Sequence, residues 1–177
     1  MSFDNPLDYL EQFEAGALSD AFWDHALVDH LNTSVASSPY YNVFLMAQVN
    51  AHDKGFLSEQ IEVKTMLEER GDIHHLFPKK YLIKSGMSNK GMYNQIANYV
   101  YLQTEINIKI SDDDPKEYMS VVMNQIETGN GVYGGITNKE ELKKNHEMNC
   151  IPEGFENMTI EDYPRFLDSR RKLMAQK

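Results

Sequence analysis

The amino-acid sequence predicts a mainly helical α+β domain in which a small segment with two strands, residues 72–111, is embedded among helices. Apolar residues recur at helical spacing on both sides of this segment. Within it, two short apolar runs, 72–77 and 98–102, favour strands. The length of 177 residues is enough for one domain with a substantial core. We therefore expect a single domain spanning residues 1–177, with helical parts at 1–71 and 112–177.

Three helices are expected before residue 52. The first spans 6–14, with Pro6 suited to its first turn and Gly16 expected to end it. The second follows the capping pair Ser19-Asp20, and the third runs from Tyr40 to about Ala51. The apolar residues that mark their core-facing stripes are Leu7, Leu10 and Phe13, then Phe22, Trp23, Leu27 and Leu31, then Val43, Phe44, Met46, Ala47 and Val49.

The central segment is expected to alternate short elements. Residues 61–69 form either a short helix or a strand that runs into one, and Gly71 allows a sharp turn into the first strand. Pro78 ends that strand, because proline has no N–H to donate to a sheet. One or two helical turns at 79–85 and a loop with a short helix at 87–95 lead to the second strand. A helix then runs from Thr104 to about Lys109.

Three helices are expected after residue 112. Two of them span Lys116–Ile126 and Asn138–His146, and the last follows the capping pattern Thr159–Asp162. The glycine-rich loop 129–135 lacks the Lys-Ser/Thr that a phosphate-binding loop needs. In the last helix we expect Tyr163, Phe166, Leu167, Leu173 and Met174 to be buried and Arg165, Arg170, Arg171 and Lys172 to face water.

Charge is unevenly distributed along the chain. The net charge of −10 argues against a protein that simply coats nucleic acid. Residues 1–60 hold nine acidic residues against Lys54, a balance of −8, whereas residues 70–109 hold six basic residues against two acidic ones, a balance of +4. An acidic surface with one basic segment can steer a polyanion to that segment.

Other features limit the class of protein. Cys150 is the single cysteine, which excludes an intramolecular disulfide and a cysteine-based zinc site, and we expect it to be a buried small side chain. No apolar run is long enough to span a bilayer, and the N-terminus lacks the features of a signal peptide. We expect a cytoplasmic protein with no membrane partner.

Two adjacent histidines, His74 and His75, lie on the first predicted strand. Successive side chains of a strand point to opposite faces, so one of the two rings must meet solvent or a ligand. One imidazole can hold a divalent metal while its neighbour, neutral near pH 7, accepts a proton from water.

Polar residues suited to the same site follow. The amide of Asn98 can orient the base through its second ring nitrogen, and Asn107 can supply a neutral oxygen ligand from the helix. Lys79, Lys80 and Lys109 can hold a phosphate backbone. The alternative is that the histidines are a structural pair and that the asparagines satisfy backbone groups of a turn and a helix start.

These residues resemble a known nuclease signature. Residues 72–79 (DIHHLFPK), 96–98 (IAN) and 107–111 (NIKIS) are similar to the ββα-metal (HNH) motif in the C-terminal nuclease domain of GmrSD-type, modification-dependent restriction enzymes and related phage-defence proteins. The resemblance extends to the flanking helical segments, at 34–39 and 151–174, and covers the chain from about residue 15 to its end. It implies a small ββα-metal module at 72–111 within the helical domain.

The resemblance also implies roles. His75 is expected to be the general base, and Asn98 the residue that orients it. His74 and Asn107 are expected to be metal ligands, with Asp72 assisting the metal or its waters.

The chain departs from the three-histidine metal sites of colicin-type nucleases at Ser111, a poor ligand four residues after Asn107. Two neutral protein ligands favour magnesium or manganese with several bound waters over tightly held zinc.

The expected function is metal-dependent hydrolysis of DNA phosphodiester bonds by an endonuclease, in restriction of or defence against foreign or modified DNA. Larger proteins of the family carry an N-terminal domain resembling ParB-like nucleotide hydrolases, so such a domain or subunit is an expected partner, as is a second copy in a homodimer. The alternative is a non-catalytic module that binds DNA or a protein and retains the nuclease framework. The residue types do not separate a DNase from an RNase.

Overall fold

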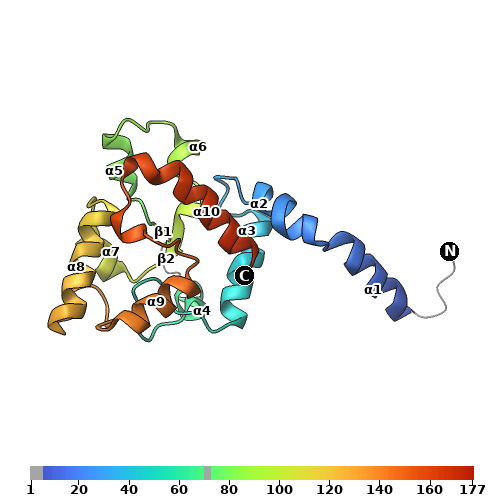
Figure 1. Ribbon diagram of the computed structural model, residues 1–177, viewed down its shortest axis with the longest axis horizontal. Coiled ribbons are helices and arrows are strands. Elements are labelled where there is room, and N and C mark those ends of the chain that lie inside the picture. Colours follow the sequence, from blue (N-terminus) through green and yellow to red (C-terminus); the bar gives the residue numbers. More distant parts are fainter. Residues whose placement is uncertain (1–5, 70–72) are drawn as a thin grey trace.

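The computed structural model describes residues 6–69 and 73–177, and these are mainly helical with one two-stranded antiparallel sheet (Figure 1). The mainly helical α+β class predicted from the sequence is confirmed at this level. Asp72, which we expected near the metal, lies outside the described residues.

The N-terminal part begins with α1 (Pro6–Ala17), which extends away from the rest of the molecule (Figure 1). Gly16 lies within this helix and does not end it. Leu7, Leu10 and Phe13 are exposed, so the apolar stripe of α1 does not face the core. The chain then forms a π-helical turn (Phe22–Ala26), α2 (Leu27–His30), α3 (Pro39–Asn50) and α4 (Val63–Glu68).

The buried face of α3 differs from the expected one. Val43 and Met46 are 60% and 56% exposed. The buried positions are Tyr41, Phe44, Leu45 and Gln48, which follow the i, i+3, i+4, i+7 spacing of one helical face. Because α3 carries apolar residues on all sides, the spacing of apolar residues alone does not show which side of the helix is buried.

The sheet pairs β1 (Ile73–His75) with β2 (Tyr99–Tyr101), and His74 lies opposite Val100. Between the strands come α5 (Lys79–Lys84), α6 (Lys90–Tyr93) and a 3₁₀ turn (Ile96–Asn98), and α7 (Thr104–Ile110) follows β2. The predicted order of a strand, two short helical segments, a second strand and a helix is therefore present.

The C-terminal part contains α8 (Pro115–Thr128), α9 (Lys139–Met148) and α10 (Tyr163–Ala175), with 3₁₀ turns at Phe155–Asn157 and Ile160–Asp162. Side chains cap the starts of these helices. Asp114 and Glu117 form a capping box at α8, Asn138 accepts from the N–H of Glu141 at α9, and Thr159 and Asp162 form a capping box before α10.

An aromatic cluster joins the end of β1 to the C-terminal part. The ring of Phe77 lies 4.9 Å from that of Phe166 and 5.0 Å from that of Tyr163, between ring centroids. Phe155 lies 5.9 Å from Phe77 and packs against Tyr118 of α8. Phe77, two residues after His75, is therefore held in place by contacts with α10.

Arg170 and Arg171 are buried, contrary to the expectation that they face water, and Leu173 is 37% exposed. Both arginines fall on the buried helical stripe of Tyr163, at positions i+7 and i+8. Arg170 donates to the carbonyl oxygens of Ala97 and Asn149 at 2.7 to 3.3 Å, and these bonds replace water around its guanidinium.

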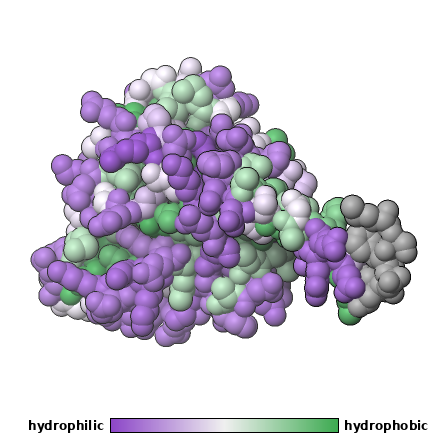
Figure 2. Space-filling view, turned by 45° about the vertical axis from the view of Figure 1, so that its right-hand side comes forward, coloured by the Kyte–Doolittle hydropathy of each residue, from purple (hydrophilic) through white to green (hydrophobic). Residues whose placement is uncertain are grey.

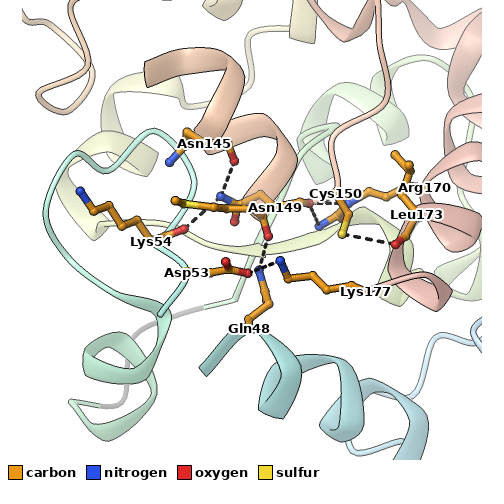
Figure 3. Close-up of polar contacts among 10 residues, drawn as sticks. Gln48, Asp53, Lys54, Asn145, Asn149, Cys150, Arg170, Leu173 and Lys177 are labelled. Carbon is orange, nitrogen blue, oxygen red and sulfur yellow. Dashed lines mark hydrogen bonds and ion pairs between the residues drawn. The ribbon is translucent and has the colours of Figure 1, made fainter. Parts of the chain in front are cut away.

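A buried polar network surrounds this arginine (Figure 3). Asn149 donates to the carbonyls of Lys54 and Asn145, and Asn145 bonds the backbone of the 55–58 loop. Lys177 pairs with buried Asp53 at 2.6 Å. Together these contacts join α9 and α10 to the loop that precedes α4.

The surface is largely hydrophilic on the face shown in Figure 2, with hydrophobic residues visible between the polar ones. Within residues 6–69 and 73–177, no helix has the length and apolar character needed to cross a bilayer.

Candidate functional site

A groove of about 460 Å³ lies between β1, the start of α5 and the end of α7. Five of the eight predicted site residues line it, namely His74, His75, Lys79, Lys80 and Asn107. The remaining lining residues are Ile73, Pro78, Ile108 and Ser111. The groove thus brings together histidines, lysines and an asparagine from three elements.

The local sequence explains this arrangement. Pro78 caps α5 with an extended backbone, so Lys79 and Lys80 fall in the first turn of that helix, next to the histidines. Asn107 and Ser111 are four residues apart, which places both on the groove side of the end of α7. Lys84 of α5 pairs with Asp112 after α7, which joins two walls of the groove.

His75 is half-buried at the groove. Its Nε2 atom lies 3.0 Å from Oδ1 of Asn94. The centre of its ring lies 5.0 Å from the centre of the Tyr99 ring, and the two rings are nearly perpendicular. Burial lowers the pKa of His75, the bond to Asn94 opposes this, and nearby Lys79 and His74 lower it further. The lowered pKa favours a neutral imidazole at neutral pH, which can accept a proton.

The backbone directly after His75 is held from both sides. Leu76 donates its N–H to the carbonyl of Asn98 at 2.8 Å, and its own carbonyl accepts from the hydroxyl of Tyr118 at 2.8 Å. The Asn98 side chain accepts from the N–H of Phe77 at 2.8 Å and donates to its carbonyl at 3.1 Å. All four backbone polar groups of Leu76 and Phe77 are therefore satisfied by buried partners.

The expected hydrogen bond between Asn98 and the His75 ring does not occur among the described residues. Asn98 is fully buried and holds the Phe77 backbone, and it also donates to the Tyr93 carbonyl at 3.4 Å. Asn98 comes one residue before β2, and its side chain bonds the Phe77 backbone in the turn that follows β1. Asn98 is thus placed to fix the path of the chain leaving His75, and the ring contact belongs to Asn94.

Arg170 extends this support to the C-terminal helix. Its Nη1 donates to the carbonyl of Ala97, the residue before Asn98, at 2.7 Å. Burial lowers the pKa of Arg170 to about 10, so it remains charged at neutral pH. Tyr163 of α10 donates its hydroxyl to the carbonyl of Met92 at 3.0 Å, which anchors α6 and the nearby Asn94.

Lys109, like Asn98, is a predicted site residue that does not line the groove. Its ammonium donates to the carbonyl of Val132 at 2.8 Å. Lys79, by contrast, lies at the groove with its ammonium 5.4 Å from the centre of the Tyr93 ring. Lys79 and Lys80 therefore form the basic part of the groove.

His74 on β1 and Asn107 on α7, the two residues expected to bind a metal, line the same groove. Across residues 6–69 and 73–177 there is no group of three His, Cys, Asp or Glu side chains that could hold an ion. Two neutral donors fit an ion that keeps most of its coordinating waters, which is typical of magnesium.

Ser111 has a backbone conformation that serine rarely adopts. Its φ is 55° and ψ is −108°, and the N–H of Asp113 donates to the carbonyl of Ile110 at 3.1 Å, so residues 110–113 form a turn of type II′ geometry. Glycine is the usual residue at this position. A strained residue therefore lines the groove beside Asn107.

Sequence reasoning did not identify Asn94 or Tyr118 as parts of the site. Asn94 lies two residues before the buried run 96–102, and a polar residue at that boundary is a weak signal in the sequence. Tyr118 lies on the apolar stripe of α8, where nothing distinguishes it from a core residue.

No protein family model, curated protein or solved structure matches the chain, so the function proposed below rests on the groove and its residues.

Proposed function

We propose that the protein is a metal-dependent endonuclease that hydrolyses DNA phosphodiester bonds. One observation carries this proposal, namely the single groove in which His74, His75, Lys79, Lys80 and Asn107 meet. A neutral imidazole can act as the general base, two ammonium groups can bind phosphate oxygens, and two neutral donors can hold a metal ion for hydrolysis of a phosphodiester.

Each residue has a role in the proposed reaction. His75 takes a proton from the water that attacks phosphorus, and its lowered pKa suits a base at neutral pH. Lys79 and Lys80 bind phosphate oxygens of the substrate. His74 and Asn107 would hold a divalent ion, magnesium or manganese, which would supply positive charge for the phosphate and the leaving oxygen.

The wider role proposed from the sequence resemblance is restriction of foreign or modified DNA in the cytoplasm. An N-terminal ParB-like nucleotide-hydrolase domain or subunit is the proposed regulatory partner. A homodimer would allow both strands of a duplex to be cut.

The test is cleavage of supercoiled plasmid with magnesium, manganese or EDTA, on plain and on hydroxymethylated or glucosylated DNA. We expect metal-dependent nicking that falls at least about 100-fold in His75→Ala, since loss of a general base typically costs 10²–10⁴-fold. His25→Ala is the matched control, because His25 is an exposed histidine far from the groove in sequence and should retain full activity. Unchanged cleavage by His75→Ala would rule out the proposed mechanism.

The second candidate is a non-catalytic module that binds nucleic acid through the same groove. The net charge of −10 and the lack of a three-residue His, Cys, Asp or Glu cluster among the described residues favour it. DNA binding that weakens in Lys79→Ala, without cleavage under any metal condition, would establish this function. Parallel assays on RNA of the same sequence distinguish a DNase from an RNase.

A further inference from the structure

Asn94 is the side chain that contacts the ring of His75, with Oδ1 placed 3.0 Å from Nε2. We propose that Asn94 is a positioning residue that selects the tautomer of His75, because its carbonyl oxygen accepts from Nε2–H and leaves the lone pair on Nδ1. The catalytic consequence rests on the proposed nuclease function, whereas the tautomer does not.

The position of Asn94 is itself fixed. Asn94 ends α6, where its backbone N–H donates to the carbonyl of Lys90 at 3.0 Å. The two preceding carbonyls, of Met92 and Tyr93, accept from the hydroxyl of Tyr163 at 3.0 and 3.4 Å. Asn98 donates to the same Tyr93 carbonyl. The amide of Asn94 is thus presented to His75 from a segment that α10 and the 3₁₀ turn hold in place.

The choice of tautomer decides whether His75 can act as a base. A neutral imidazole carries one N–H and one lone pair. With Nε2–H bonded to Asn94, Nδ1 is the ring nitrogen that can accept a proton. Within the described parts of the chain, Nδ1 itself makes no hydrogen bond. If the amide were turned so that its NH₂ donated to Nε2, Nδ1 would carry the proton and could not remove one from water.

The packing of the ring supports a single orientation. Tyr99 lies opposite His75 in the sheet register, and their rings meet at 5.0 Å with an interplanar angle of 86°. A ring held between Tyr99 and Asn94 cannot turn over without losing one of these contacts. Position and tautomer of His75 are therefore set by neighbours that do not need to touch a substrate.

The test records ¹⁵N NMR signals of the histidine rings in wild type, Asn94→Asp and Asn94→Leu at pH 8. His75→Gln identifies the signals of His75 by their disappearance. Asn94→Asp keeps an acceptor oxygen and has no donor, whereas Asn94→Leu has neither. We expect the Nε2–H form in wild type and in Asn94→Asp, and a mixture of tautomers in Asn94→Leu.

Cleavage assays on the same variants add the catalytic consequence. Asn94→Leu should lower kcat at least 10-fold with KM changed less than 2-fold, and Asn94→Asp should retain most of the activity. An Nδ1–H tautomer in wild type, or one unchanged in Asn94→Leu, overturns the proposal whatever the assays give. The expected tautomers in a protein that cleaves no nucleic acid support the positioning role and overturn the nuclease function instead.

Discussion

Ser111 is a residue at which the sequence and the backbone conformation disagree, because it occupies the glycine position of a type II′ turn. We expect Ser111→Gly to raise the free energy of unfolding by about 0.5 to 1 kcal/mol, since relief of about 1–2 kcal/mol of left-handed strain exceeds the entropy that glycine loses on folding. Urea unfolding followed by circular dichroism measures the change.

Ser111→Ala is the matched control, because alanine keeps the strain and removes only the exposed hydroxyl that donates to Asp112. It should change stability by less than about 0.5 kcal/mol. A glycine variant less stable than wild type would show that the turn does not have this geometry.

His146 is a half-buried histidine outside the groove, and burial of its ring lowers its pKa from 6.5 to about 4. Because the unfolded chain binds the proton more tightly, stability should be fully present above pH 6.5 and fall as the pH drops toward 4. The loss amounts to about 3.5 kcal/mol at most, at 1.4 kcal/mol per pKa unit. Urea unfolding at several pH values in this window should show a smaller decline in His146→Phe.

The surroundings of His146 simplify this experiment. Phe56 stacks on its ring. His146 lines a second groove, separate from the candidate site, whose charged lining residues are Lys139, Lys143, Glu147, Glu153 and Glu156. None of these forms an ion pair with His146 among the described residues. His25→Phe, at an exposed histidine, is the control and should leave the decline unchanged. An equal decline in His146→Phe would assign the acid sensitivity to other groups.

At the scale of elements, one hydroxyl connects β1 with α8. Tyr118→Phe removes the donor to the Leu76 carbonyl and leaves a buried acceptor without its bond. The expected loss is about 1–3 kcal/mol of unfolding free energy, measured by thermal or urea unfolding. Tyr133→Phe is the matched control, because Tyr133 is buried and its hydroxyl makes no hydrogen bond within the described residues. Equal effects of the two variants would show that the hydrogen bond from Tyr118 to the Leu76 carbonyl does not stabilise the fold.

Helix positions could be predicted where the sequence carries caps. Asn138 marks the start of α9, and the pair Thr159 and Asp162 precedes α10. Buried faces were harder to predict, because α3 has apolar residues all around and because Arg170 lies on the buried stripe of α10 despite its charge. At α10 the helical spacing predicts the buried positions of Arg170 and Arg171 better than residue type does.

Part of the site could be predicted from the resemblance to the HNH signature. It implies that the histidines, Lys79, Lys80 and Asn107 belong to one site, and all five residues line one groove. The partners of Asn98 and Asn94 could not be predicted, because both lie in or beside a 3₁₀ turn whose side-chain directions do not follow from sequence spacing. The contact of Lys109 with Val132 depends on a loop whose path is set by tertiary packing.

At the scale of the whole molecule, an acidic chain presents a groove with two lysines at one side. If the groove binds DNA, log Kd should change with log salt concentration, and each lost lysine contact should reduce the slope by about 0.9. We expect Lys79→Ala and Lys80→Ala each to show this reduction in fluorescence-anisotropy titrations at salt concentrations from about 50 to about 200 mM. Lys109→Ala is the control of equal charge change, and an equal reduction there would place binding outside the groove.

The supports of the groove lie outside the strand–strand–helix segment that forms it. Tyr118, Tyr163 and Arg170 bond to backbone atoms of residues 76, 92–93 and 97 from α8 and α10. A segment cut at residues 72 and 111 and transplanted into another protein would keep the motif but lose these anchors. Recombination during evolution would meet the same constraint, so the motif and the C-terminal helix should be inherited together as one unit.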